Sequence, residues 1–185
     1  MNAARTSVAL VVLVIGFSPM AMAASACSTK ARIPAAARIF ARASAQSDWS
    51  EYRSFKELPE LKPESGMYAV YWQYNRKRSS VYIVEPGQDF WLYTRYCFSR
   101  EGELEGMDFE IGTTLGWGHR AEGPVANGGF DASHGEFFST GNGKAIGRPQ
   151  GVGEIPPAVK PTLYRTIRDL PFALLLNRPS LVSRR

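Results

Sequence analysis

Residues 67–74 read MYAVYWQY, and this stretch decides the fold class. Aromatic and β-branched residues dominate it, and such residues favour extended strands. Large apolar side chains occupy both of its alternating sets of positions, which is typical of a strand in the middle of a sheet. Residues 80–84 continue the same composition after a basic tip at 75–78. The two segments therefore predict a β-hairpin.

Further strands are predicted after this hairpin. A turn at 85–88, EPGQ, precedes a strand over residues 89–99. Residues 104–115 alternate between apolar side chains and acids, which predicts a strand with one solvent-exposed face. Beyond Gly116 the chain becomes glycine-rich. We expect loops there, with one or two short edge strands.

Helical segments are expected at both ends of the sheet. Between residues 28 and 46, apolar residues recur at the i, i+3, i+4, i+7 spacing of a helix face. Residues 161–176 show helical spacing too, and Pro171 is expected to kink or divide that helix. The predicted fold class is therefore α+β: an antiparallel sheet of about four to six strands flanked by an N-terminal helix and a C-terminal helical segment.

The first 23 residues have the order of a secretory signal. Arg5 is the one charge ahead of an apolar run at 8–17, and residues 21–23 place small side chains where a signal peptidase reads them. Cleavage is expected before Ala24. The apolar run is shorter than the roughly 20 residues of a membrane span. We therefore expect an exported protein, periplasmic or extracellular, with no transmembrane segment in the mature chain.

The rest of the chain has the length of one domain. Residues 24–65 are predicted to form an N-terminal helical and loop segment. Residues 66–146 are predicted to form the antiparallel sheet core. Residues 147–185 are predicted to be a linker and a C-terminal helical segment that packs on the same domain.

Two cysteines remain after removal of the signal, Cys27 and Cys97. An even number of cysteines in an exported protein favours a disulfide between them. A competing interpretation attaches a lipid to Cys27, because residues 24–27, ASAC, loosely resemble a bacterial lipobox. Ala24 stands where such a box usually has Leu, and the apolar run ends ten positions earlier, so the lipid anchor is the less favoured alternative.

Aromatic residues are concentrated between Trp49 and Phe109, and one sheet does not obviously bury them all. A sheet lined with aromatic side chains is a common docking surface. The favoured hypothesis is a non-enzymatic module that binds a protein, an envelope component or a small apolar ligand. Well-filled packing under two helices is the alternative explanation of the same residues. The candidate ligand-binding residues are Trp72, Tyr74, Tyr82, Trp91 and Trp117.

Nucleic acid is not an expected partner. The basic tip at 75–78 lies among tyrosines and tryptophans, a combination that single-stranded nucleic acid binders use. An exported protein rarely meets such a partner, and the net charge of +5 is modest. The tip is therefore interpreted as a solvated turn.

The second functional hypothesis is a small metal-assisted or acid–base hydrolase that uses the glycine-rich loops around His119 and His134. Its candidate ligands for zinc or another divalent metal are His119, Asp131, His134 and Glu136, all of suitable donor type. Their spacing matches no established motif, and ordinary surface residues explain them as well. Asp108 and Glu110 offer another carboxylate pair on one face of a strand. The favoured hypothesis needs no cofactor, and no catalytic residue is assigned.

Overall fold

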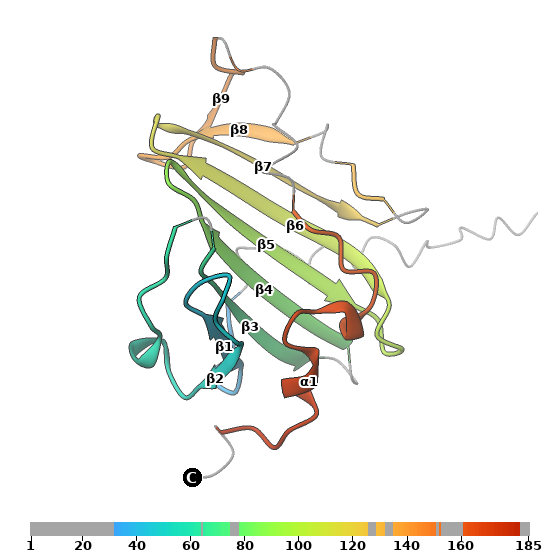
Figure 1. The fold of residues 1–185 in the computed structure, drawn as a ribbon. Helices are drawn as coiled ribbons and strands as arrows, with labels where there is room; N and C mark the ends of the chain where they lie inside the picture. The colour runs from blue at the N-terminus through green and yellow to red at the C-terminus, as the bar shows by residue number, and fades with distance from the viewer. Residues whose placement is uncertain are drawn as a thin grey trace, which may run out of the picture.

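The computed structural model describes residues 32–63, 65–74, 78–125, 129–131, 135–150, 152 and 161–181. Within these residues the chain forms one antiparallel sheet of nine strands, in the order β2-β1-β3-β4-β5-β6-β7-β8-β9 (Figure 1). The strands are β1 (Arg38–Arg42), β2 (Ser50–Tyr52), β3 (Met67–Tyr74), β4 (Arg78–Pro86), β5 (Phe90–Phe98), β6 (Leu104–Thr113), β7 (Trp117–Pro124), β8 (Glu136–Ser139) and β9 (Ala145–Ile146). From β3 onwards each strand pairs with the next in sequence, so most of the sheet is a meander.

The predicted α+β class is wrong, because the described residues form an almost all-β protein. Their helical elements are η3 (Phe55–Glu57), η5 (Ile167–Asp169) and α1 (Ala173–Leu176), each a single turn. The sheet of the described residues has nine strands instead of the predicted four to six, because β1, β2 and β7 were not expected. None of the described helices is long and apolar enough to span a membrane.

The N-terminal helix expected within residues 28–46 is replaced by β1 where the structure describes the chain. β1 lies between β2 and β3, and the side chains of Ile39, Phe40 and Ala41 are all buried. The apolar spacing that indicated a helix also allows a short strand that is buried on both faces, so long-range pairing decides between the two. Residues 28–31 lie outside the described part.

The C-terminal helix expected at 161–176 is also wrong. Residues 161–166 contain no helix, and the helical turns η5 and α1 lie on either side of Pro171. The backbone of this segment pairs with the sheet: Leu104 N–H donates to Arg165 O at 2.9 Å and Ile167 N–H donates to Gly102 O at 2.8 Å. Backbone groups used in this way are not available for an i to i−4 helical ladder.

The hairpin of residues 67–74 and 80–84 is confirmed as β3 and β4, and β5 and β6 lie where strands were predicted. The predicted solvent-exposed face of residues 104–115 is wrong. β6 lies between β5 and β7, and Asp108 is only 4% exposed. The acids of β6 therefore occupy an interior part of the sheet, where alternation alone does not indicate solvent.

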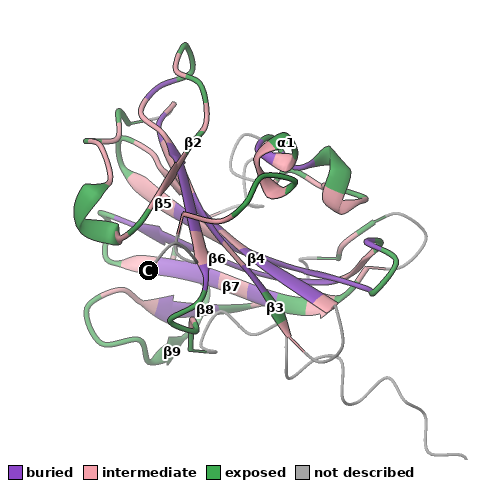
Figure 2. Cartoon of the chain, turned by 90° about the horizontal axis from the view of Figure 1, so that it is seen from below, coloured by how far each residue is buried: buried purple, intermediate pink, exposed green. Residues whose placement is uncertain are grey.

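The two faces of the sheet have different partners. On one, which we call the core face, Phe40, Val81, Tyr96 and Met107 pack with side chains of the C-terminal segment 161–181, including the 1% exposed Phe172. Figure 2 shows α1 lying against one side of the sheet. We call the opposite side the Arg95 face. The core face is thus closed by the chain itself.

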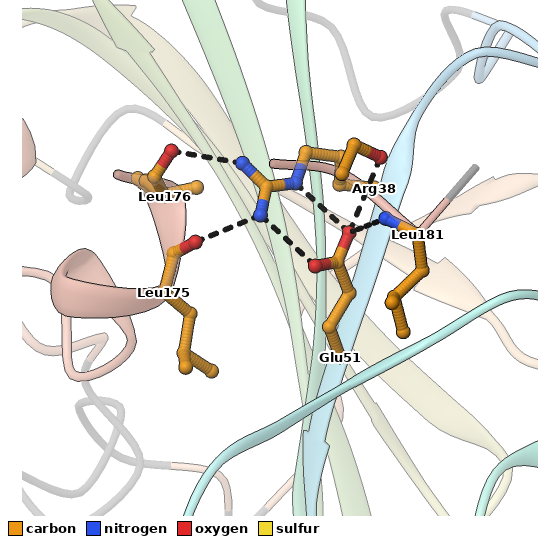
Figure 3. Close-up of polar contacts among 6 residues, drawn as sticks. Arg38, Glu51, Leu175, Leu176 and Leu181 are labelled. Atoms are coloured by element: carbon orange, nitrogen blue, oxygen red, sulfur yellow. Dashed lines mark hydrogen bonds and ion pairs between the residues drawn. The ribbon is translucent and has the colours of Figure 1, made fainter. Parts of the chain in front are cut away.

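A buried ion pair holds the C-terminal segment against the β1–β2 edge (Figure 3). The Arg38 guanidinium donates to both carboxylate oxygens of Glu51, at 2.9 and 3.0 Å. The same group donates to the carbonyl oxygens of Leu175 and Leu176, at 2.7 and 2.9 Å, where α1 ends. A cation there satisfies carbonyls that the helix leaves without partners. The contact links residues that lie far apart in sequence.

Candidate functional site

Strand register brings four of the five predicted ligand-binding residues to the Arg95 face. Trp72 lies opposite Ser80, Tyr74 opposite Arg78, and Tyr82 opposite Arg95. Directly opposed residues of antiparallel strands point to the same side of the sheet. Trp91 also belongs to this face, because the strand positions of Trp91 and Arg95 differ by an even number.

The fifth predicted residue, Trp117, lies on the core face. It is opposite Ser139 on β8, and its ring lies 5.9 Å from that of Phe137. Trp117 therefore does not join the other four residues. Successive residues of a strand point to opposite faces, and the sequence did not indicate which residues of β7 lie opposite those of its neighbours.

Arg95 occupies the middle of the Arg95 face and is 1% exposed. Its guanidinium lies 5.0 Å from the ring centroid of Trp72 and 5.7 Å from that of Tyr82. Asp108 lies directly opposite it on β6. Burial lowers the pKa of Arg95, and the nearby charge of Asp108 opposes that shift. Aromatic rings and a carboxylate together stabilise a cation at this position.

Tyrosines form a half-buried row beside Arg95. The rings of Tyr82 and Tyr93 are nearly parallel, with centroids 5.9 Å apart and an interplanar angle of 4°. Trp91 approaches Tyr93 edge-on at 6.5 Å. Burial raises the pKa of Tyr82, Tyr93 and Tyr68 above that of a free tyrosine. Their hydroxyls are therefore protonated at neutral pH, and each can both donate and accept a hydrogen bond.

Two glycines let aromatic rings lie against the backbone beyond this row. Gly112 and Gly118 are directly paired on β6 and β7. A Cβ atom on Gly112 would overlap the Trp91 indole, and one on Gly118 would overlap the Phe138 ring. Any residue other than glycine at position 112 or 118 would therefore displace the ring that lies over it.

Charged side chains of both signs surround the rings. Arg120 forms an ion pair with Glu136 and lies 5.4 Å from the centroid of Phe138. Glu110 lies opposite both Tyr93 and Arg120. The described carboxylates of this face are Glu105, Asp108, Glu110, Glu122 and Glu136, and the described guanidiniums are Arg78, Arg95 and Arg120. The face thus has no excess of basic groups among the described residues.

The candidate metal ligands are not brought together in the described residues. His119 lies opposite Phe137, whereas Glu136 lies opposite Arg120, so these two side chains point to opposite faces. Asp131 is exposed, and His134 lies outside the described residues. The described part of the chain contains no group of three His, Cys, Asp or Glu side chains that could hold a metal ion.

His119 instead belongs to the packing of the core face. Its ring lies 4.8 Å from Phe137 and 6.0 Å from Phe109. Burial lowers its pKa, and the charge of Arg148 adds to that shift. A neutral imidazole among phenylalanines suits a core position.

The sequence did not identify Arg95 as a site residue. Asp108 and Glu110 do share one face, as alternation predicted, but the partner of Asp108 depends on the register between β5 and β6. One sequence signal was available: an arginine stands alone within the apolar strand 90–98. Such a residue needs paired or aromatic neighbours when it is buried.

Cys97 lies on the Arg95 face and is 4% exposed. Cys27, its predicted disulfide partner and the alternative lipid attachment point, lies outside the described residues. So does the signal predicted for residues 1–23. The disulfide, the lipid anchor and export therefore stay predictions.

Comparisons with protein-family models, with curated proteins and with solved structures find no match for this chain.

Proposed function

We propose that this protein is an exported, non-enzymatic module that binds an uncharged carbohydrate chain of the cell envelope on its Arg95 face. The observation that carries the proposal is the row of half-buried rings formed by Tyr82, Tyr93 and Trp91. A sugar ring has C–H groups on its faces and hydroxyls on its rim. Aromatic faces with hydroxyl handles fit such a ligand, because they offer apolar contact and hydrogen bonds together.

The charge of the Arg95 face argues against an anionic ligand. Among the described residues its carboxylates outnumber its guanidiniums, as the strand register and the ion pair of Arg78 with Glu105 show. A polyanion such as nucleic acid would require a basic groove. Several of these charges already have partners, since Arg120 pairs with Glu136 and Arg95 faces Asp108. Paired charges add hydrogen-bonding groups for sugar hydroxyls without attracting a strongly charged partner.

The fold also favours this face for binding. The C-terminal segment closes the core face, with Phe172 stacked on Phe40 at 4.7 Å. The predicted secretory signal supports an envelope location for the ligand. We therefore expect a glycan, rather than a cytosolic metabolite, to meet the Arg95 face.

The test is calorimetric titration of the mature protein with a neutral tetrasaccharide of N-acetylglucosamine. Tyr93→Ala removes the central ring of the row, and we expect it to weaken binding about tenfold. Gly112→Val displaces the Trp91 indole and should also weaken binding. Leu115→Ala is the matched control, because Leu115 is an apolar side chain 79% exposed in the turn after β6.

Folding of each variant is checked by thermal unfolding before titration. Saturable heat with the wild type, retained by Leu115→Ala and weakened in folded Tyr93→Ala, supports the proposal. Absence of binding at millimolar tetrasaccharide, or equal affinity of Tyr93→Ala and wild type, overturns it.

A further inference from the structure

A cavity of about 350 Å³ opens at the edge of the sheet, between β2 and the C-terminal segment. Its lining residues come from 49–51 on one side and from the chain between Leu175 and Leu181 on the other. Glu51 is opposite Phe40, so the cavity lies on the core-face side of the sheet and away from the Arg95 face. Sites for small molecules usually have volumes of about 300–1,000 Å³. The cavity is therefore large enough for a small ligand.

Apolar side chains form most of the wall. Leu175 and Leu181 line the cavity and lie on either side of Glu51 (Figure 3). The half-buried Trp49 adds an aromatic ring, which is fixed by packing on Phe172 with centroids 5.1 Å apart. A wall held by such contacts exists before a ligand binds. An apolar ligand placed against it would lose contact with water, which is favourable.

Glu51 lines the cavity, but its negative charge is already compensated. The Arg38 guanidinium donates to both of its carboxylate oxygens, at 2.9 and 3.0 Å. Ser180 Oγ and Leu181 N–H donate to the same carboxylate at 3.3 Å. A cationic ligand would have to compete with Arg38 for these oxygens. The cavity is therefore not built to select a cation.

Arg178 supplies a positive charge that is not compensated. It lines the cavity and is exposed, and its backbone N–H donates to Leu175 O at 3.1 Å. Within the part of the chain that the structure describes, its guanidinium has neither a hydrogen-bond nor an ion-pair partner. A guanidinium binds a carboxylate through two parallel N–H···O bonds. The cavity thus combines an apolar wall with a group that recognises one anionic end.

We propose that this cavity binds a small apolar carboxylate, whose apolar body lies against Leu175 and Leu181 and whose carboxylate pairs with Arg178. The volume is about a dozen times the roughly 30 Å³ that a water molecule occupies in the liquid, so it suits a molecule of about ten to twelve non-hydrogen atoms. A medium-chain fatty acid has this size and this charge. The site is independent of the proposed carbohydrate function, because it lies on the other side of the sheet.

The bound acid contacts both β2 and the C-terminal segment, so it should strengthen their association. It acts beside the contact of Arg38 with Glu51, which already joins these two parts of the chain. A ligand that binds only the folded state raises the melting temperature as its concentration rises. The backbone amides of Leu175 and Arg178, which bond within the turn that lines the cavity, should also exchange with deuterium more slowly when the acid is bound.

The test is calorimetric titration of the mature protein with octanoate and with octanamide, which has the same chain and no charge. We expect saturable binding of octanoate and about tenfold weaker binding of octanamide, the effect of losing one charged hydrogen-bonding group. Arg178→Met should weaken octanoate binding about tenfold and leave octanamide binding unchanged. Leu181→Ala shortens the apolar wall and should weaken the binding of both ligands.

Arg100→Met is the matched control, because Arg100 is also exposed and lies in the turn between β5 and β6, away from the cavity. This variant should bind octanoate like the wild type. Absence of saturable heat at millimolar octanoate, or equal octanoate affinity of folded Arg178→Met and wild type, overturns the proposal. Equal affinity of the wild type for octanoate and octanamide overturns it too, since the charge would then play no part.

Tyr93→Ala separates this site from the proposed carbohydrate site. We expect it to leave octanoate binding unchanged, and we expect Arg178→Met to leave tetrasaccharide binding unchanged. Octanoate binding that is weakened by Tyr93→Ala and not by Arg178→Met would place the acid on the Arg95 face and overturn the inference. Failure of the tetrasaccharide to bind, with octanoate binding that depends on Arg178, would overturn the carbohydrate function and support this site.

Discussion

The buried pair of Arg38 and Glu51 is expected to determine whether the C-terminal segment stays on the core face. Its side chains are only 11% and 9% exposed. Arg38→Met keeps much of the aliphatic stem but removes every hydrogen bond of the guanidinium. Removal of one partner from a buried ion pair costs about 3–5 kcal/mol, because the remaining charge stays buried. For a domain of this size the corresponding fall in melting temperature is about 10 °C.

The loss of stability in Arg38→Met should also appear locally, at the end of α1. Arg38 donates to the carbonyls of Leu175 and Leu176, so its removal leaves the end of α1 without its partner. Backbone amides in this turn, including those of Leu175 and Arg178, should exchange with deuterium much faster than those of β4 and β5. Glu51 keeps two weaker donors, Ser180 Oγ and Leu181 N, both at 3.3 Å.

Arg78→Met is the matched control. Arg78 pairs with Glu105 at 3.3 Å, but these side chains are 42% and 34% exposed. Exposed ion pairs contribute about 0–1 kcal/mol. Thermal and urea unfolding of both variants, with hydrogen exchange of the folded state, give the comparison. A melting temperature of Arg38→Met within 2 °C of the wild type, or equal effects of the two substitutions, would refute the reasoning.

Two further predictions concern the core face. Phe172→Ala removes a ring that is 1% exposed and stacked on Phe40, so urea unfolding should show a loss of about 3–5 kcal/mol; a loss below about 1 kcal/mol would contradict this packing. Burial lowers the pKa of His119 in the folded protein, so at a pH between its folded and unfolded pKa values the unfolded state binds more protons. The folded state therefore loses stability as the pH drops below the unfolded pKa of about 6.5. His119→Leu should therefore flatten the fall in melting temperature between pH 7 and 5, whereas an unchanged slope would exclude His119 as its source.

The central hairpin could be predicted from the sequence because its signals are local. In residues 67–84, strand composition on both sides of one turn indicates two strands and their pairing. The ends could not be predicted in this way. β1 is only five residues long, and its pairing with Tyr68 and Val70 depends on chain far away in sequence. Helical spacing over so short a segment does not distinguish a helix turn from a doubly buried strand.

The candidate site could be predicted only in part. The concentration of aromatic residues between Trp49 and Phe109 was enough to associate Trp72, Tyr74, Tyr82 and Trp91 with a sheet surface, and the register shows that they share one face. The pairing of Arg95 with Asp108 needs the β5–β6 register, and that register includes a shift at Cys97 and Phe98. An irregularity of this kind moves side chains relative to the neighbouring strand, and the sequence does not show where it occurs.

The composition of the Arg95 face also argues that packing alone does not account for it. Arg95 and Asp108 are buried opposite each other, and a buried charged pair often gives no more stability than apolar residues of similar size. The core face shows the alternative, since Val81, Tyr96 and Met107 are covered there by apolar side chains of the C-terminal segment. Tyrosine hydroxyls with raised pKa and a guanidinium close to two aromatic rings are instead groups that form directed contacts. The test is the joint replacement of Arg95 by Met and of Asp108 by Leu, which should make the fold more stable in either case. If the two residues serve only packing, tetrasaccharide binding should stay unchanged. If they hold the ring of Tyr82 for a ligand, tetrasaccharide binding should weaken.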